Sequence, residues 1–291
     1  MAVLEAKYGT CSHRLIADAG ATKTEVVKLD LRSGNVLSRI DLPGVNPIAM
    51  SAQEVETIVK PLASMFDGET DVVWFGAGCL PGMPSESVAE ALRKCGANCS
   101  IYVGSDMLGA ALALLGDAEG IACILGTGSN SCYVKDGTII CSVPPLGYIL
   151  GDEGSATALG KRVLREYARN MMPEEVAASF REEALSDKPL DLSVVYSGDT
   201  RRYLASFAPF LGKHKDNPYL RQLIKDEFCA FVGGMLSRYE RFGSVPVAVT
   251  GSVAHFFSDI LYEVLTETAN IDVKIVRRPM DGLIDYFRQA R

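Results

Sequence analysis

Several common metal and membrane signatures are missing from this chain. Its eight Cys and three His form no CxxC, HxxxH or HExxH pattern, so spacing predicts no zinc, iron–sulfur or metalloprotease site. Cys95 and Cys99 alone are too little for such a site. No run of eighteen apolar residues occurs, which argues against a membrane-spanning helix. Met1–Arg14 lacks the long apolar core of a signal peptide, so no signal peptide is expected there. Residues 1–12 are expected to be a loose leader.

Basic residues are also fewer than acidic ones. The chain has 29 Lys and Arg against 36 Asp and Glu, a formal net charge of −7. This disfavours nucleic acid or an anionic membrane as a main partner, although a local nest of N–H groups can still bind phosphate. Several cysteines lie in apolar runs, where buried reduced thiols are common. We therefore expect a cytoplasmic protein without disulfides.

The hydrophobic content of 48% allows a large core, and the length of 291 residues suggests two domains. A β-β-β-α-β-α-β-α pattern fills roughly the first 115 residues and then restarts near Gly120, so the two halves resemble diverged copies of one α/β unit. In the first half we expect strands at 13–18, 24–30, 35–40, 71–77 and 99–103, and helices at 51–65, 84–95 and 104–115.

The second half is expected to be richer in helices. Its short apolar strands suit a central sheet that is covered on both faces. The expected strands are 120–125, 131–135, 138–143, 245–249 and 271–276, and the expected helices are 154–170, 173–184, 200–210, 216–241, a helix ending near 267 and a last one after Pro279.

The motif Asp18-Ala-Gly-Ala-Thr-Lys-Thr24 connects the first two strands. Its glycine lets a ligand approach the backbone, its threonines offer hydroxyls and its lysine adds a positive charge. The N–H groups of such a turn can form an anion nest, and Asp18 at the strand end can hold Mg²⁺ through water. The residues alone leave two interpretations open, a phosphate-binding hairpin or an ordinary glycine-containing turn.

A second glycine turn, Gly126-Thr-Gly-Ser-Asn130, follows the first strand of the second half. A strand rather than a helix comes next, so the dinucleotide-binding context fails. No GxxxxGK[ST] occurs either, which excludes a P-loop. The turn can bind phosphate, or it can be a plain hairpin turn.

Three further segments combine a bend with polar groups. Gly104-Ser105-Asp106 opens a helix, where the aspartate can be a cap or a general base. Gly151-Asp-Glu-Gly-Ser155 is an acidic pair between glycines, which suggests a tightly bent loop that faces the substrate. Thr250-Gly-Ser-Val-Ala254 follows a strand and opens a helix, which suits nucleotide contact. Helix capping is the alternative for both. The pairs Lys161-Arg162 and Arg201-Arg202 are interpreted as solvated helix faces.

The ordered set of these motifs resembles the superfamily of sugar kinases, heat-shock ATPases and actin. More narrowly, the chain resembles the N-acetylglucosamine kinase and BadF/BadG-type ATPase family over nearly its whole length. This resemblance implies an α/β fold with two ribonuclease H-like (actin-like ATPase) domains and a nucleotide cleft between them. The implied domains are residues 1–115 with the C-terminal helix 279–291, and residues 116–278 with a helical insertion.

The resemblance also implies roles for individual residues. Asp106 matches the catalytic aspartate, and Asp18 the residue that orients Mg²⁺ through water. The implied ATP phosphate contacts are Gly20, Thr22, Lys23, Thr24, Gly126, Thr127, Gly128 and Ser129. The implied adenosine contacts are Gly251, Ser252 and Ala254, and the implied sugar contacts are Asn46, Asp106, Gly147 and Asp152.

The activity implied is phosphoryl transfer from MgATP to an amino sugar, in the first place to the 6-hydroxyl of N-acetylglucosamine. One departure bears on the sugar: vertebrate-type N-acetylglucosamine kinases carry Trp-Gly where this chain has Leu146-Gly147. Two alternatives remain, an ATP-dependent activator of a partner enzyme, as some BadF-type relatives are, and a non-enzymatic sugar sensor. We expect no nucleic-acid or membrane partner and leave a homodimer open.

Overall fold

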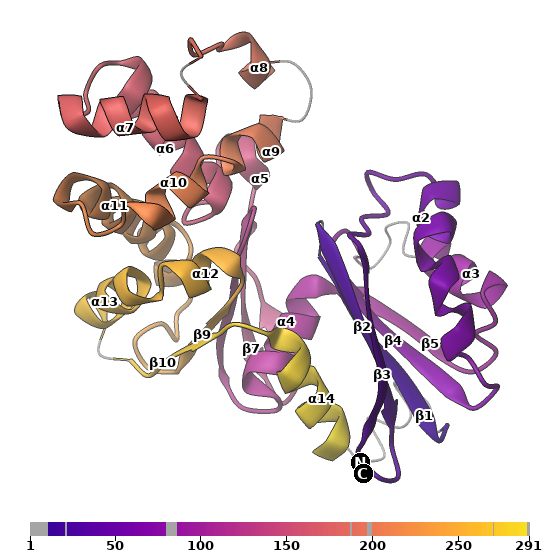
Figure 1. Cartoon of the computed structure of the whole chain (residues 1–291). Coiled ribbons are helices and arrows are strands. Elements are labelled where there is room, and N and C mark those ends of the chain that lie inside the picture. Colours follow the sequence, from indigo (N-terminus) through magenta and orange to yellow (C-terminus); the bar gives the residue numbers. More distant parts are fainter. Residues whose placement is uncertain are drawn as a thin grey trace. The chain divides into compact units, whose positions relative to one another are not determined.

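The computed structural model describes residues 11–20, 22–79, 86–186, 188–196, 200–269 and 271–289. The chain divides into two compact units (Figure 1). The first contains the described residues up to Ala118, the turn Asp136–Thr138 and those from Arg278 onward. The second contains Glu119–Lys135 and the described residues of Ile139–Arg277. Most of the leader expected over residues 1–12, and the start of the helix expected at residue 84, lie outside the described residues.

The first unit is built on a five-stranded sheet with the order β3-β2-β1-β4-β5. β1 pairs antiparallel with β2 and parallel with β4, and β4 pairs parallel with β5, so the carboxyl ends of β1, β4 and β5 share one edge. Its strands are β1 (His13–Ala19), β2 (Lys23–Asp30), β3 (Val36–Pro43), β4 (Thr70–Gly76) and β5 (Ile101–Ser105).

Helices cover both faces of this sheet (Figure 1). α2 and α3 pack on the face that carries Leu15 and Trp74. α4 and α14 pack on the face that carries Ile16 and Phe75, so the last helix of the chain completes the core of the first unit. The helices are α2 (Ala52–Val59) with the 3-10 helix η1 (Lys60–Met65), α3 (Glu86–Lys94), α4 (Asp106–Leu115) and α14 (Pro279–Gln289).

The second unit repeats this strand order. Its sheet runs β10-β9-β6-β7-β8, so the first, second and third strands of each unit lie side by side and the fourth and fifth extend the sheet beyond the first. This shared topology confirms that the two halves are built on one plan. The strands are β6 (Gly120–Leu125), β7 (Ser129–Lys135), β8 (Thr138–Cys141), β9 (Val247–Thr250) and β10 (Val273–Val276).

The helices of the second unit enclose one large core that includes Leu125, Phe180 and Phe231. Three helices expected as continuous are interrupted. The one expected over 216–241 ends at Gly234 and is followed by a separate 3-10 helix, Leu236–Arg238. The one expected over 200–210 becomes two, because Pro209 is tolerated only in the first turn of a helix. The one ending near residue 267 is divided at Phe257. The helices are α5 (Gly147–Leu150), α6 (Ala156–Ala168), α7 (Glu174–Leu185), α8 (Ser193–Tyr196), α9 (Thr200–Ala205), α10 (Ala208–Lys213), α11 (Pro218–Gly234), η2 (Leu236–Arg238), α12 (Ser252–Phe256) and α13 (Ser258–Thr268).

The hairpin turn Asp136–Thr138 differs from the expected domain division. A boundary after residue 115 assigns it to the second domain, whereas its contacts are with the first unit. Asp136 N–H donates to the carbonyl of Asp117 at 3.1 Å. The turn therefore lies with the first unit although both strands that it joins belong to the second sheet.

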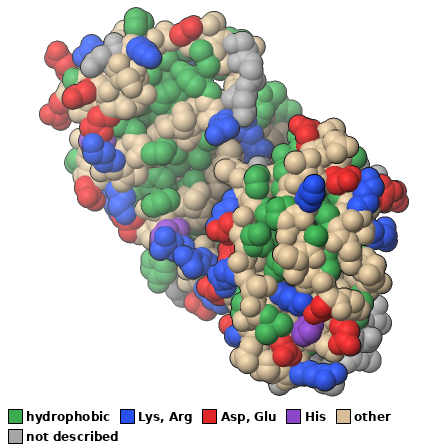
Figure 2. Space-filling model, turned by 45° about the vertical axis from the view of Figure 1, so that its right-hand side comes forward, with side chains coloured by type: hydrophobic (Ala, Val, Ile, Leu, Met, Phe, Trp, Pro, Cys, Tyr) green, Lys and Arg blue, Asp and Glu red, His purple; other side chains and the backbone are tan. Residues whose placement is uncertain are grey.

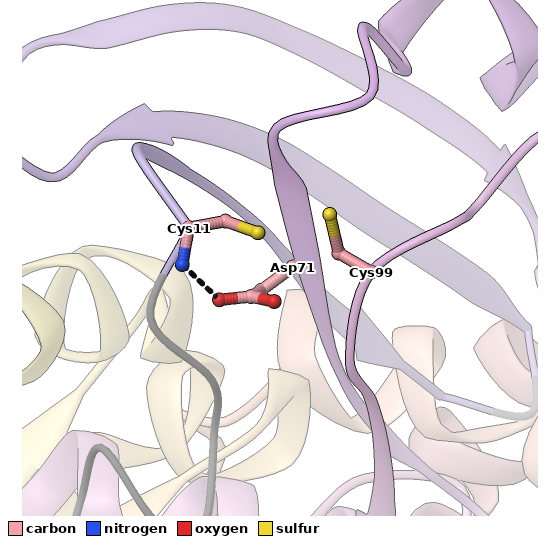
Figure 3. Close-up of side chains that lie close together, drawn as sticks. All are labelled: Cys11, Asp71 and Cys99. Atoms are coloured by element: carbon pink, nitrogen blue, oxygen red, sulfur yellow. Dashed lines mark hydrogen bonds between the residues drawn. The ribbon is translucent and has the colours of Figure 1, made fainter.

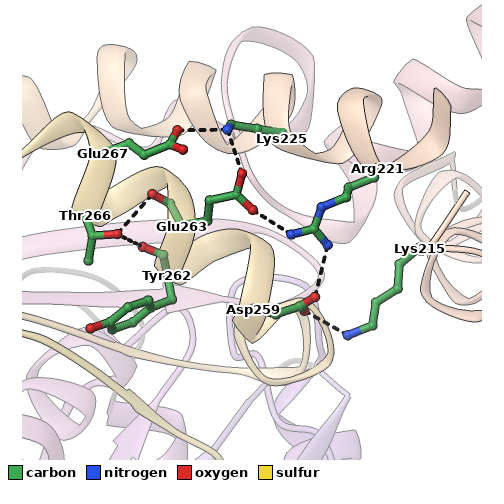
Figure 4. A network of polar contacts seen from close by, with 8 residues as sticks. All are labelled: Lys215, Arg221, Lys225, Asp259, Tyr262, Glu263, Thr266 and Glu267. Atoms are coloured by element: carbon green, nitrogen blue, oxygen red, sulfur yellow. Dashed lines mark hydrogen bonds and ion pairs between the residues drawn. The ribbon is translucent and has the colours of Figure 1, made fainter. Parts of the chain in front are cut away.

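A ladder of ion pairs fixes α13 against α11 (Figure 4). Arg221 bridges Asp259 and Glu263, and Lys225 reaches Glu263 at 2.7 Å. Each rung is partly exposed and contributes little alone, but a network of this kind holds one helix in register with its neighbour. α13 follows α12, the helix that carries the expected adenosine contacts Ser252 and Ala254, with only Phe257 between them.

Charged side chains of both signs lie on the surface. Figure 2 shows Lys and Arg side chains interspersed with Asp and Glu on the face in view. Among the described residues, no helix combines the length and the apolar character that crossing a bilayer requires.

Candidate active site

Two aspartates lie at the carboxyl-end edge of the first sheet. Asp18 is next to last in β1, and Asp106 follows the last residue of β5. The register Asp18↔Phe75 and Gly76↔Ser105 brings these two strand ends to either side of β4. Each apolar strand therefore delivers a carboxylate to the same edge, where both side chains are only partly buried.

The charge of this aspartate pair is not balanced. Burial first, and then the negative charges of Asp106 and Glu25, raise the pKa of Asp18 to about 7, while Lys23 opposes the shift. A carboxyl group with this environment is a site where a cation is favoured, because a cation stabilises the ionised form. The carboxylates thus fit a hard divalent ion such as Mg²⁺, which prefers oxygen ligands.

Asp106 is positioned by the start of α4. Ser105 is the N-cap, and its hydroxyl accepts from Leu108 N–H at 3.1 Å. This leaves the cap role to the serine, so Asp106 stands at the first helical position, where its carboxylate accepts from Met107 N–H at 2.8 Å. The helix N-terminus favours the ionised carboxylate that a general base requires.

The hairpin expected after β1 is present. Gly20 N–H donates to the carbonyl of Lys23 at 2.9 Å, which closes the turn. Thr22 and Lys23 are exposed, and Lys23 pairs with Asp41 at 2.9 Å. Thr24 is fully buried, and its hydroxyl has no hydrogen-bond partner among the described residues. The phosphate-binding roles of Gly20, Thr22, Lys23 and Thr24 stay predictions.

The first unit also holds the expected sugar contact Asn46. Its side-chain oxygen accepts from Ile48 N–H at 3.1 Å, so the asparagine stabilises the turn around Pro47. The side chain is partly buried.

In the second unit, the glycine turn Gly126–Ser129 is attached to the start of α6. Ala156 N–H donates to the Gly126 carbonyl at 2.9 Å, and the Thr157 hydroxyl donates to the Thr127 carbonyl at 2.7 Å. These bonds direct the carbonyl groups of the turn toward the helix. The register Ile124↔Thr250 brings the Thr250–Ala254 turn to the same sheet edge. Within it, Ser252 is exposed and Ala254 is fully buried.

Asp152 lies beside this turn in a bent loop. It is 3% exposed and adopts a left-handed backbone conformation with φ of 61°, which is strained for a residue other than glycine. Its Oδ1 accepts from Ser129 N–H at 3.4 Å. Burial is the main cause of the raised pKa of Asp152, and the Ser129 bond and the charges of Arg201 and Lys161 oppose the shift.

Glu227 of α11 supports the Asp152 loop through a hydrogen bond to its backbone. It is 6% exposed, its Oε1 accepts from Gly154 N–H at 3.2 Å, and its Oε2 accepts from Arg162 Nε at 2.9 Å. Arg162 was expected on a solvated helix face, and this expectation is wrong because the side chain is engaged with a buried carboxylate. Lys161 likewise donates to the carbonyl of Tyr148 at 2.5 Å.

Comparison with solved structures gives a relative with the same fold and substantial sequence identity. The putative N-acetylglucosamine kinase from Porphyromonas gingivalis is 37% identical to this chain, with a TM-score of 0.85 and coverage of 94% of this chain and 98% of that one. The chain belongs to the family of this sugar kinase.

More distant structures share the fold. The putative N-acetylglucosamine kinase from Chromobacterium violaceum is 17% identical, with a TM-score of 0.67 and coverage of 95% of this chain and 99% of that one. A ROK-family glucokinase from Streptomyces griseus, in complex with glucose and AMPPNP, is 14% identical, with a TM-score of 0.58 and coverage of 96% and 99%. No protein-family model matches the sequence, and no curated protein matches it.

The position of Arg201 differs from the one expected from the sequence. Arg201 was expected on a solvated helix face, but it is partly buried, and its Nε is buried without a partner among the described residues. A Cβ on Gly128 would collide with Arg201 Nη2 and lie 2.9 Å from Asp152 Oδ2. Gly128, the Asp152 carboxylate and the Arg201 guanidinium therefore lie close together. No local pattern around Arg201 indicates this, since the contact spans many residues of chain.

Two cysteines and an aspartate form the one group of possible metal ligands found among the described residues (Figure 3). Their ligand atoms lie within 4.8 Å of one another. The aspartate, Asp71, already accepts from Cys11 N–H at 2.8 Å and from Ser100 N–H at 3.2 Å. Burial, together with Cys99 and the Asp71 charge, raises the pKa of the Cys11 thiol to about 12. Asp71 of β4 accepts from residues just before β1 and β5, so its carboxylate ties the starts of these strands together.

The cysteine group bears on the activator alternative, which relies on cysteine ligands for an iron–sulfur cluster. The sequence analysis considered Cys99 together with Cys95 as possible metal ligands, whereas in the structure Cys99 lies near Cys11. The group stands at the amino ends of β1 and β5, the opposite sheet edge from Asp18 and Asp106. It therefore lends no support to a cluster at the candidate active site.

Proposed function

We propose that this protein is an ATP-dependent kinase that phosphorylates the 6-hydroxyl of an amino sugar, with N-acetylglucosamine as the first candidate. The family membership supports the class of reaction. The observation that carries the proposal is the pair Asp18 and Asp106 at one sheet edge of the first unit, with a cation-deficient environment that raises the pKa of Asp18.

In the proposed reaction Asp106 is the general base. MgATP supplies the phosphoryl group: a bond forms between the sugar oxygen and phosphorus, the bond to the leaving oxygen of ADP breaks, and the hydroxyl proton passes to Asp106. A positioned base contributes about 10²–10⁴-fold to such a rate. The rest of phosphoryl transfer depends on positioning and charge stabilisation.

Asp18 is proposed to hold Mg²⁺ through water. Its raised pKa indicates that the ionised side chain lacks a sufficient counter-charge, and the oxygen donors suit this ion. The turns Gly20–Thr24 and Gly126–Ser129 are proposed to hold the phosphates through their N–H groups, and Gly251, Ser252 and Ala254 to contact the adenosine.

Asn46, Gly147 and Asp152 are the proposed sugar contacts. Asp152 is the best supported, because its Oδ2 is buried and has no hydrogen-bond partner among the described residues. A buried acceptor in this state favours a donor from a ligand, and a sugar hydroxyl is such a donor.

The acceptor sugar is tested by ADP release from MgATP. The panel contains N-acetylglucosamine, glucosamine, N-acetylmuramic acid, N-acetylmannosamine and glucose, with a control that lacks sugar. We expect strong stimulation by one amino sugar and loss of that stimulation in Asp106→Asn. Equal slow hydrolysis in every sample would contradict the kinase proposal.

A further inference from the structure

Arg201 and Asp152 present opposite charges to the Gly126–Ser129 turn. The charge of Arg201 acts against the rise in the pKa of Asp152, but no hydrogen bond joins the two side chains among the described residues. Both are beside Gly128, where a side-chain carbon would collide with the Arg201 Nη2 atom. Arg201 Nε and Asp152 Oδ2 are each buried without a hydrogen-bond partner among the described residues. Leaving buried polar atoms without a hydrogen-bond partner is costly, so this arrangement favours a ligand that brings an acceptor to Arg201 Nε and a donor to Asp152 Oδ2.

The backbone of Arg201 is held firmly at this place. The Thr157 hydroxyl, which donates to the Thr127 carbonyl at 2.7 Å, also lies 3.4 Å from the carbonyl of Arg201. One turn further along, a Cβ on Gly160 of α6 would collide with the carbonyl of Leu204. α9 therefore packs directly on α6, the helix whose first N–H groups hold the glycine turn, and the guanidinium is attached to the turn by rigid elements.

The chemistry of Arg201 and of Asp152 indicates which ligand group each side chain can bind. A guanidinium presents N–H donors in a planar fork that matches phosphate oxygens. A buried carboxylate oxygen accepts from a hydroxyl. A molecule that meets both at Gly128 carries phosphate on one side and hydroxyl on the other, as the donor and acceptor of a sugar kinase do when the phosphoryl group is transferred.

We propose that Arg201 is a catalytic residue that contacts the phosphoryl group in transfer. This inference rests on the proposed kinase function and adds a residue to it. The guanidinium donates hydrogen bonds to the non-bridging oxygens of the group while phosphorus exchanges the ADP oxygen for the sugar oxygen. It neither gains nor loses a proton, and its charge offsets the negative charge of the transferring group.

The first test compares kinetics of Arg201→Met, Arg201→Lys and the neighbouring Arg202→Met. We expect Arg201→Met to lower kcat about 10²–10³-fold. Arg201→Lys should recover part of this, because lysine keeps the charge but not the planar fork. Arg202 is exposed, so Arg202→Met should leave kcat unchanged. Guanidine hydrochloride at non-denaturing concentration should restore activity to Arg201→Ala, which a purely structural role would not allow.

The second test does not require turnover. Affinities for ADP and AMPPNP are measured by calorimetry in the wild type and in Arg201→Met. Because only AMPPNP carries the γ-phosphate, loss of the contact should weaken its binding about 10–100-fold relative to ADP. Arg201→Gln is a second variant with a similar side-chain length, for use if Arg201→Met fails to fold.

The outcomes separate this inference from the kinase proposal. An active wild type with Arg201→Met of unchanged kcat, or with only the sugar KM raised, would overturn the catalytic role, since the arginine would then serve Asp152 alone. A wild type that no sugar stimulates would refute the kinase proposal. In that case an unchanged ratio of the AMPPNP and ADP affinities in Arg201→Met would also refute the phosphate contact, and a changed ratio would support it.

Discussion

Replacing Asp18 with Asn should stabilise the ligand-free protein above pH 7 while it destroys Mg²⁺-dependent activity. The pKa of Asp18 is raised to about 7, first by burial and then by the charges of Asp106 and Glu25. Above that pH the folded protein must keep an ionised carboxylate in a place that disfavours it. Asparagine has nearly the same shape and carries no charge, so the variant avoids the cost.

The magnitude follows from the two pKa values. The folded state holds a proton on Asp18 up to about pH 7, whereas the group's ordinary value is 3.8. Stability therefore falls as the pH rises between these values and stays constant above them. At 1.36 kcal/mol for each pKa unit, the whole difference corresponds to about 4 kcal/mol. Because the side chain is partly exposed and water screens its charge, we expect about half of this.

The assay uses the single tryptophan of the chain. Trp74 lies fully buried in β4 of the first unit, so its fluorescence during urea unfolding reports the unit that contains Asp18. Wild type and Asp18→Asn are compared at pH 5 and pH 8 without Mg²⁺. Subtracting the unfolding free energies of the two proteins removes the pH-dependent contribution of other groups. One such group is Asp67, whose pKa is lowered mainly by its bond to Lys28.

We expect Asp18→Asn to gain about 1 kcal/mol over the wild type on going from pH 5 to pH 8, because the rest of the difference has already developed between the group's ordinary pKa of 3.8 and pH 5. Addition of Mg²⁺ at pH 8 should then stabilise the wild type, by about 1.4 kcal/mol at ten times its dissociation constant, and not the variant. Parallel pH profiles for the two proteins would show that Asp18 does not hold a proton in the folded state, and the argument for a cation site would lose its basis.

Three other variants test separate parts of the site. Asp106→Asn should reduce sugar phosphorylation about 10²–10⁴-fold and leave AMPPNP affinity unchanged in calorimetry; a folded variant that no longer binds the nucleotide would contradict the base role. Glu227→Gln weakens the support of Gly154 and the pairing with Arg162, so it should lower the melting temperature and raise the sugar KM more than the ATP KM. Leu146→Trp restores the aromatic of vertebrate-type kinases at a 62% exposed position, and an additional 50 Å² of contact should lower the KM for N-acetylglucosamine about tenfold, with glucosamine as the comparison substrate.

Local sequence predicted the parts of the site that depend on neighbouring residues. The hairpin after β1 follows from an apolar run, a carboxylate and a glycine-containing turn within one short segment. The capping box at the start of α2 joins Ser51 and Glu54, which are only three positions apart. The restart of the strand pattern near Gly120 was enough to predict two similar halves, because each strand order follows from the order and length of successive elements.

Contacts between distant segments could not be predicted in this way. Arg201 belongs to a short helix with no distinctive pattern, and its position is decided by how closely α9 packs on α6. Similarly, Cys11 and Cys99 meet only because parallel strands bring their amino ends to one edge. Arg162 was misjudged because its partner, Glu227, lies on another helix. In each case tertiary packing determines whether a charged side chain is solvated.

The two units use one topology for opposite electrostatic tasks. In the first, the strand ends carry Asp18 and Asp106, and the resulting excess of negative charge suits a proton acceptor and a metal ion. In the second, the corresponding turn after β6 carries glycines, and an arginine from α9 reaches it. The proposed phosphoryl transfer requires both a base for the hydroxyl and positive charge for the phosphate. Asp106 in the first unit and Arg201 in the second are the residues proposed for these two roles, so the proposal assigns one role to each copy of the topology.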